Sequence, residues 1–324
     1  MKWFFLLLPA FLHPVAIVLI HLGSHLPAHL PLCVEQARLF NPEVPIYLVA
    51  NEQALSSLSS DLPVIAVAAE TLPKSSSHQF FIRHNHLDKH FLKGFWVYTT
   101  ERFFYLDSLM KKYSLTDVFH LENDVMLYVD LTHTLPLFRK NYPDQIAATF
   151  DNDVRCIAGF MYIPHREPLK SLTHFIGSRA RHGGNDMELI ASFKNNNASA
   201  IDHLPILMPA YAENRALEST SRQYRTNTPS RYFHCFEDFR SIFDAAAIGQ
   251  YLGGIDPYHG SNTIGFINES ALFNASDFTY EWIPDEHGRS IPYALYQGER
   301  YKINNLHIHS KNLSLFLSQP QGLP

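Results

Sequence analysis

The sequence has few cysteines and lacks several motifs that mark common binding sites. Its three cysteines, Cys33, Cys156 and Cys235, lie far apart and form no CxxC pair, so neither a disulfide framework nor a thiolate metal site is expected. No GxGxxG follows the first apolar run and no GxxxxGK[ST] occurs, which disfavours dinucleotide and P-loop chemistry. The net charge of −5, without a block of like charges, makes nucleic acid an improbable partner.

Apolar residues are plentiful by contrast. With 46% hydrophobic residues among 324, the chain can bury a large core in one big domain or two fused halves. Short apolar runs at 15–23, 44–51 and 62–69 alternate with a segment of helical spacing at 30–40. This alternation predicts an α/β fold with a mostly parallel sheet covered by helices on both faces. Ligands of such sheets bind beyond the carboxyl ends of the strands, here around His21, Gly23 and Asn51.

The first thirteen residues, MKWFFLLLPAFLH, form an apolar extension whose role the sequence leaves open. It resembles a signal or anchoring segment, but prolines and a histidine interrupt the run of about 20 apolar residues that a membrane span needs. An ordered or loosely docked extension is the alternative. We favour a cytoplasmic or peripheral membrane location, with a secretory lumen as the alternative, since N-x-S sequons occur at Asn197, Asn268, Asn274 and Asn312.

A long helix is predicted over residues 94–113, GFWVYTTERFFYLDSLMKKY. Phe95, Thr99, Phe103 and Leu106 follow its apolar stripe, and Arg102 lies beside that stripe and should be partly sheltered. The simplest interpretation is a core helix with one arginine whose charged end reaches solvent.

The next apolar segment, TDVFHLENDVMLY at 116–128, is predicted to be the fourth strand and contains two acids. In an extended backbone, Glu122 and Asp124 point to one face and Asn123 to the other. A buried pair of carboxylates is costly unless something positive lies between them, and a divalent cation that carries diphosphate oxygens meets this need. A solvated turn between two strands is the alternative, because Asn-Asp is common in turns.

A second group of candidate ligands lies near the C-terminus, in YKINNLHIHSKNL at 301–313. His307 and His309 are two residues apart and fall on one face of any strand, with Lys311 just beyond. Imidazole binds metals and lysine pairs with phosphate. Because imidazole suits Mn²⁺ better than Mg²⁺, manganese is the favoured ion and magnesium the alternative. Of the two histidines, His309 is favoured, as it is closer to the carboxyl-end crevice and to Lys311.

Taken in order, these segments resemble the GT-A glycosyltransferases, which use nucleotide-diphospho-sugars. The resemblance spans residues 14–313 and rests on TTERFFYL, the acid-x-acid triplet, AGFMYI, NDMELI and the late histidine with a nearby lysine. It departs from the family in the triplet itself, which is E-N-D, and in the absence of H-x-G-x-x-K-P-W. The resemblance implies a nucleotide-sugar-binding half at 14–150 and an acceptor-side half with a mixed sheet at 151–324, in one continuous domain.

The resemblance also implies roles for individual residues. Asp124 matches the last Asp of the family's DxD motif and would hold the metal, while Glu122 takes the first position. Arg102 and Lys311 would contact the donor diphosphate, and Gly159 would let the backbone approach the sugar. His307 or His309 would complete the metal site. The donor-side residues are His21, Gly23, Arg102, Glu122, Asn123, Gly159 and Lys311.

Two further acids are candidates for the acceptor side. Asp244 opens an Ala- and Gly-rich stretch that leaves room for a ligand, and Asp186 stands at a predicted helix start. Either could act as a general base in an inverting enzyme or stabilise the sugar in a retaining one, and Asp244 is the first choice. Helix N-capping is the alternative for both.

The sequence thus predicts a metal-dependent transferase that moves a sugar from a nucleotide-diphospho-sugar to an unknown glycan, lipid or protein hydroxyl. A metal-dependent hydrolase and an inactive carbohydrate-binding or scaffold protein of the same fold are the alternatives. The donor, the acceptor and the stereochemical outcome are not predicted, because a fold alone does not supply them.

Overall fold

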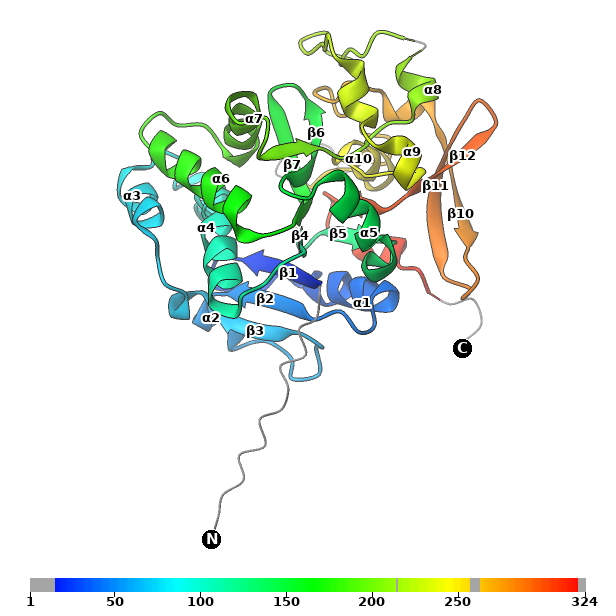
Figure 1. Ribbon diagram of the computed structural model, residues 1–324. Helices are drawn as coiled ribbons and strands as arrows, with labels where there is room; N and C mark the ends of the chain where they lie inside the picture. The colour runs from blue at the N-terminus through cyan, green and yellow to red at the C-terminus, as the bar shows by residue number, and fades with distance from the viewer. Residues whose placement is uncertain (1–14, 214, 257–262, 320–324) are drawn as a thin grey trace.

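A computed structural model describes residues 15–213, 215–256 and 263–319 and shows an α/β architecture (Figure 1). A seven-stranded sheet forms its centre, in the order β3-β2-β1-β4-β7-β6-β8. The buried apolar side chains of both predicted halves form one continuous core. Residues 1–13 lie outside the described residues, so the interpretations of this extension stay predictions.

The first half of the central sheet is parallel, as the sequence predicts. β1 lies between β2 and β4, and β2 continues to β3, all in parallel register. The run AIVLIH of β1 is apolar and β-branched because the strand is buried on both faces. The bounds are β1 (Ala16–His21), β2 (Ile46–Ala50), β3 (Ile65–Ala68) and β4 (Val118–Leu121).

The second half is mixed, which confirms the expected fold class. β7 (Arg155–Ile163) runs antiparallel to both β4 and β6 (Ile146–Asn152), and β8 (Ile201–His203) returns parallel to β6. A separate four-stranded sheet has the order β10-β11-β12-β9. Its strands are β9 (Ser241–Ile242), β10 (Thr279–Pro284), β11 (Ser290–Tyr296) and β12 (Glu299–Ile303).

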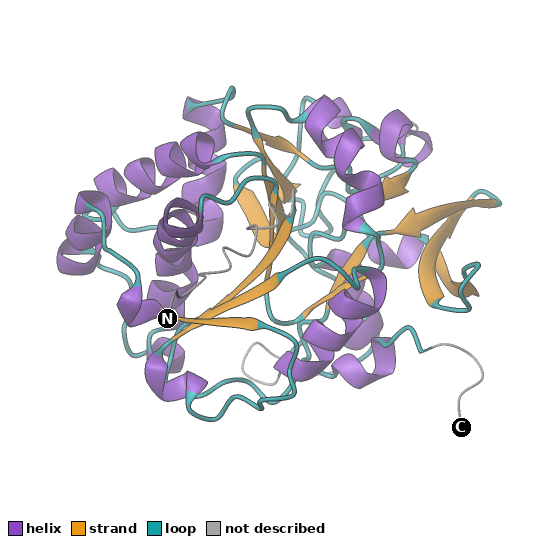
Figure 2. Ribbon diagram, turned by 60° about the horizontal axis from the view of Figure 1, so that its bottom comes forward, coloured by secondary structure: helices purple, strands orange, loops and turns teal. Residues whose placement is uncertain are grey.

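Helices cover both faces of the central sheet (Figure 2). The predicted helices at 30–40 and 94–113 correspond to α1 and α4, and Arg102 on α4 is buried rather than partly sheltered. No described helix is both long and apolar enough to cross a membrane. The bounds are α1 (Leu30–Phe40), α2 (Glu52–Leu55), α3 (Ser76–His84), α4 (Phe95–Tyr113), α5 (Leu131–Asn141), α6 (Arg166–Arg179), α7 (Asp186–Asn196), α8 (Pro209–Ala212), α9 (Phe236–Phe239) and α10 (Ala247–Gly253).

The predicted fourth strand at 116–128 is two strands. β4 ends at Leu121, and β5 (Val125–Leu127) leaves the central sheet to pair antiparallel with β13 (Asn305–His307). The residues between them form a tight turn, in which the Val125 N–H donates to the carbonyl of Glu122 at 3.1 Å. The extended backbone expected at 122–124 is therefore wrong, because the chain must turn here to change sheets.

Candidate active site

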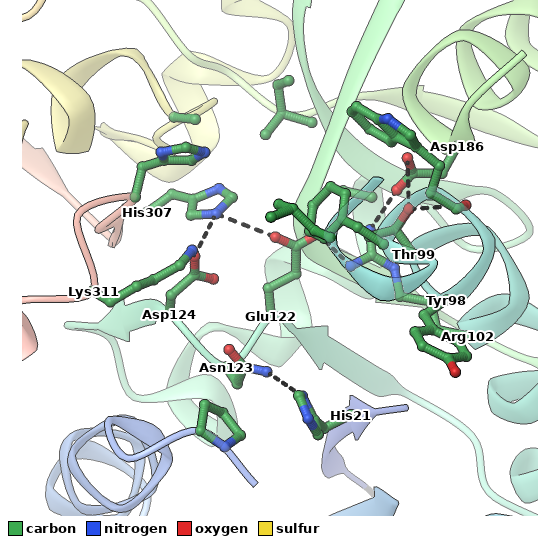
Figure 3. Close-up of a pocket in the computed structure, with 18 of the residues that line it drawn as sticks. His21, Tyr98, Thr99, Arg102, Glu122, Asn123, Asp124, Asp186, His307 and Lys311 are labelled. Carbon is green, nitrogen blue, oxygen red and sulfur yellow. Dashed lines mark hydrogen bonds and ion pairs between the residues drawn. The ribbon is translucent and has the colours of Figure 1, made fainter. Parts of the chain in front are cut away.

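A cavity of about 690 Å³ opens at the carboxyl ends of β1 and β4. Its wall includes every predicted donor-side residue except Gly159, together with Asp186 and both late histidines. The strand-end position follows the general behaviour of α/β sheets. Figure 3 shows the labelled side chains converging on this space from both halves of the chain.

The acid turn, residues 122–124, supplies the carboxylates of the cavity. Asp124 is buried and the Glu122 side chain is about one fifth exposed, so the turn is not the solvated one considered from sequence. Although the backbone is not extended, both carboxylates face the same histidine. The expected convergence of two acids is thus present, but the turn produces it and strand alternation does not.

His307 reaches the acid turn through the β13–β5 pairing, which sets His307 opposite Val125. Its Nε2 atom lies 3.2 Å from both Glu122 Oε2 and Asp124 Oδ2. Burial lowers the pKa of His307, but the two carboxylates outweigh burial and raise it to about 10. The His307 imidazolium in turn helps Lys311 to hold the pKa of Asp124 well below its usual range, against the effect of burial.

Gly159 is required here for a reason other than the one predicted. It does not line the cavity, and a Cβ atom at this position would lie 2.8 Å from His307 Nδ1. The missing side chain therefore makes room for the histidine ring and not for a sugar. This corrects the donor contact assigned to Gly159.

His309, the favoured metal ligand, lies apart from the acid turn. The strand expected across 303–309 breaks after β12, and β13 ends at His307, so the two histidines do not share a strand face. His309 Nδ1 lies 3.7 Å from a carboxylate oxygen of Asp256. Burial, helped by Lys311 and His307, lowers the pKa of His309 to about 4. The geometry therefore favours His307 over His309 as the ligand that completes the site.

Glu122, Asp124 and His307 could together hold a metal ion. One ligand atom from each lies within 4.8 Å of the others, and the set combines two oxygens with one imidazole nitrogen. Such a mixed oxygen and nitrogen set suits Mn²⁺ and does not suit a thiolate-seeking ion. Lys311 also forms an ion pair with Asp124, so its ammonium and the imidazolium neutralise the two acids.

Arg102 links the acid turn to α7. Its guanidinium forms ion pairs with Glu122 and with Asp186, the latter at 2.9 Å. Burial raises the pKa of Asp186, and the arginine only partly opposes this. Asp186 is the first residue of α7, and Asn185, not Asp186, caps that helix in a capping box. The Asp186 carboxylate therefore faces the cavity, held by Arg102 and by the Thr99 hydroxyl at 3.3 Å.

Asp244, the first choice for the catalytic base, does not line the cavity. It is 2% exposed, and its carboxylate accepts hydrogen bonds from the backbone N–H groups of Ile248, Gly249 and His307 at 2.9–3.0 Å. The catalytic prediction for Asp244 is therefore corrected. This carboxylate fastens the start of α10 to β13, which also fixes the backbone of His307.

The opposite wall of the cavity is made by His21, Gly23 and Asn123. The Asn123 side chain lies 3.2 Å from His21 Nδ1 and 3.0 Å from His29 Nε2. The Gly23 N–H donates to the Asn51 side chain at 2.8 Å, and its φ of +140° favours glycine. The Asn123 side chain points away from the two acids, and its contacts with His21 and His29 hold it in the cavity wall.

The cavity wall also includes residues that were not predicted from the sequence. His29, Trp96, Gln250 and Arg155 also line the cavity. Only Arg155 gave a local signal, as a cation at the start of an apolar strand. The others sit in segments whose composition is ordinary, so only the fold identifies them.

Comparison with known proteins gives a loose structural likeness. No family model matches the sequence, and no curated protein matches it. The chain is similar to mouse xyloside xylosyltransferase 1 at 10% identity and a TM-score of 0.44, over 68% of this chain and 94% of that one. For the galactosyltransferase LgtC, solved with donor and acceptor sugar analogues, the identity is 12% and the TM-score 0.38, over 61% and 77% of the chains.

A third similar structure has another named activity. It is a cytidylyltransferase from Leptospira borgpetersenii, at 11% identity and a TM-score of 0.38, over 59% of this chain and 76% of that one. Two of these three proteins are glycosyltransferases, the class that the sequence resembles. With TM-scores below 0.5, the likeness adds no argument about function, which is inferred from the residues of the cavity.

Proposed function

We propose that this protein is a glycosyltransferase that binds a nucleotide-diphospho-sugar and a divalent cation, favouring Mn²⁺, in the cavity at the ends of β1 and β4. The observation that carries the proposal is the meeting of Glu122, Asp124 and His307 beside Lys311 and Arg102. The buried Asp124 and the partly buried Glu122, with three cationic side chains around them, form a site that exchanges internal ion pairs for a metal and a diphosphate.

The metal would be held by Glu122, Asp124 and His307, whose donor atoms fit it. When bound, the ion supplies positive charge to the oxygens of the leaving nucleoside diphosphate. Metal binding requires a neutral imidazole, so His307 must lose the proton that the two acids stabilise.

Lys311 and Arg102 are the residues that would meet the donor phosphates. Lys311 pairs with Asp124 and lines the cavity, so its ammonium would meet a donor phosphate bound there. Arg102 is fixed between Glu122 and Asp186, so it contributes a preorganised charge that costs little reorganisation. The wall formed by His21, Gly23 and Asn123 is the proposed nucleotide side.

Asp186 is the remaining acid for the acceptor side. It faces the cavity, and burial raises the pKa of its carboxyl, which makes it a stronger base than an exposed aspartate. A proton taken from an acceptor hydroxyl would be held on the Asp186 carboxylate. If the transfer inverts the configuration of the sugar, Asp186 acts as the general base. If the configuration is retained, Asp186 contacts and stabilises the sugar.

A donor screen tests the proposal. Thermal shift with UDP, GDP and CMP, each with and without Mn²⁺, should show a rise in Tm that needs both nucleotide and metal. Mass spectrometry of a panel of nucleotide-sugars then follows nucleotide release and product mass. Asp61→Asn, which changes an exposed acid outside the cavity, is the control for Asp124→Asn.

The outcomes separate the alternatives. Metal-dependent nucleotide binding with sugar transfer supports the proposal. Release of free sugar to water identifies a hydrolase, and sugar binding without nucleotide release identifies a carbohydrate-binding or scaffold protein. No response to any nucleotide with Mn²⁺ or Mg²⁺ contradicts the proposed donor site.

A further inference from the structure

The ends of α3 and α6 form a basic surface on a chain that is acidic overall. Residues 76–94 and 166–184 together hold seven of the 26 Lys and Arg residues but two of the 31 Asp and Glu residues. The rest of the chain therefore carries 19 basic and 29 acidic residues. The positive charge is concentrated, and its location needs a physical explanation.

The two helices present this charge on one surface. α3 and α6 touch where Gly177 faces Ser77, so closely that a Cβ on Gly177 would lie 2.9 Å from the serine Cβ. The Arg181 guanidinium lies 5.2 Å from the centre of the Phe80 ring, which ties the segment after α6 to α3. Figure 1 shows the two helices next to each other at one edge of the molecule.

The cations of this surface are exposed and are not neutralised within the fold, although Arg83 donates a hydrogen bond to Gln79, and Arg179 and Arg181 lie over the rings of Phe175 and Phe80. Arg83, Arg179 and Arg181 are exposed and form no ion pair with any carboxylate of the described residues, and the same holds for Lys89 and Lys93. The two acids nearby are already engaged. Glu167 pairs with Lys170 at 3.1 Å, and Asp88 accepts N–H bonds from His90 and Phe91.

Large apolar side chains are interleaved with these cations. Phe80 and Ile82 on α3 are 36% and 40% exposed, on either side of the buried Phe81. A surface that only attracted a soluble polyanion would have no use for them. Exposed apolar groups rimmed by unpaired cations fit the boundary between lipid headgroups and acyl chains.

We propose that the α3–α6 surface, defined by Phe80, Ile82, Arg83, Arg179 and Arg181, docks the protein on a membrane that contains anionic lipids. Four to eight clustered Lys and Arg residues are typical of such contacts. Lys93 extends the charge from this surface to the mouth of the cavity, which it also lines. Docking in this way holds the cavity mouth beside the headgroup layer, and this holds whatever reaction the cavity performs.

Sedimentation with lipid vesicles tests the proposal on the full chain. The protein should bind vesicles of phosphatidylcholine with about 30% phosphatidylserine in preference to pure phosphatidylcholine, and the preference should largely vanish when the salt is raised from about 0.1 to 0.5 M. Because residues 1–13 include the cation Lys2, the charge variants described next, and not the preference alone, locate the contact.

Two matched charge changes locate the contact. Arg83→Gln with Arg181→Gln should lower the partition coefficient onto anionic vesicles about 30-fold, roughly fivefold for each charge. Lys111→Gln with Lys112→Gln removes two exposed cations from the far end of α4 and should leave it nearly unchanged. Equal losses in the two double variants, or no loss in the first, overturn the proposal.

Phe80→Ser distinguishes a bilayer from a soluble polyanion. The change keeps every charge and should weaken vesicle binding several-fold while the far-ultraviolet circular dichroism and Tm stay close to those of the parent. Unchanged vesicle binding in Phe80→Ser, with heparin competing as strongly as vesicles, would overturn membrane docking and assign the surface to an acidic macromolecule.

Discussion

The cavity is built by two regions that are specified in different ways. Residues 15–128 carry the parallel strands, α4 and the acid turn, and the strands β1 to β3 and the helices α1 and α4 follow from apolar runs and helical spacing in the local sequence. Residues 241–311 contribute His307, at the end of the short strand β13, and Lys311, in the segment that follows it. The first region provides Glu122, Asp124 and the Arg102 cation, and the second region adds the two cations His307 and Lys311.

The ion pairs across this boundary show why the second region is placed so well. Lys311 and His307 meet Asp124, and Ile308 donates its N–H to the Asp124 carbonyl at 2.9 Å. Leaving a buried carboxylate without a partner is costly, so the acid turn helps to position the C-terminal segment. The residues of the proposed binding site are thus also residues that hold the C-terminal segment in the fold.

The largest expected effect comes from the acid that both regions share. Asp124→Asn keeps the volume of the side chain but removes the charge that attracts a metal, so Mn²⁺-dependent UDP or GDP affinity should fall about 100-fold or more. Isothermal titration calorimetry with Mn²⁺ present measures this nucleotide affinity. Retained affinity in a folded Asp124→Asn protein would remove the acid turn from the metal site.

The two late histidines sharpen the comparison next. His307→Ala should weaken Mn²⁺ and nucleotide binding together by tens of fold, because its Nε2 lies 3.2 Å from both acids. His309→Ala is the matched control and should cost only a few-fold. Titration of Mn²⁺ into both variants with nucleoside diphosphate present decides between them. A larger loss in His309→Ala would restore the assignment that the sequence favours.

Gly159→Ala tests whether β7, which lies outside both regions, must leave space for the His307 ring. The added Cβ would press on His307 Nδ1, so we expect a loss of about 1–3 kcal/mol in unfolding free energy and a parallel loss of Mn²⁺ affinity. Gly177→Ala creates a similarly close contact far from the cavity, against Ser77. Urea unfolding should show destabilisation in both, whereas only Gly159→Ala should change metal titrations.

The smallest effect concerns an acid that neither region neutralises well. Burial raises the pKa of Asp151 to about 7, and Arg155 at 3.3 Å only partly opposes this. The folded state then binds a proton that the unfolded chain releases near pH 4, so stability should fall as pH rises from about 4 to 7 and stay low above that.

Asp151→Asn should flatten this dependence and raise the unfolding free energy at pH 8 by roughly 1–2 kcal/mol. Denaturant unfolding at several pH values measures it, with Asp61→Asn as the exposed control. A parent protein whose stability does not change between pH 4 and 8 would show that Asp151 is charged in the fold.

The sequence alone determined the parallel half of the sheet, α1, α4 and the identity of the acids. A buried strand shows as a short apolar run and an amphipathic helix as apolar residues at helical spacing. β1, β2 and β3 could therefore be predicted from the local sequence. The sequence also indicated that acids, a late histidine and a lysine form the candidate site, because the chemistry of these residue types can be recognised from the sequence.

Only the tertiary structure decided which of these residues meet. The β13–β5 pairing, the ion pair of Lys311 with Asp124 and the hydrogen bond from the His307 N–H to Asp244 join segments 60 to 190 residues apart. No local pattern encodes such contacts. They form because buried carboxylates and backbone groups must find partners once the core has closed, and that condition selects His307 and excludes Asp244 from the cavity.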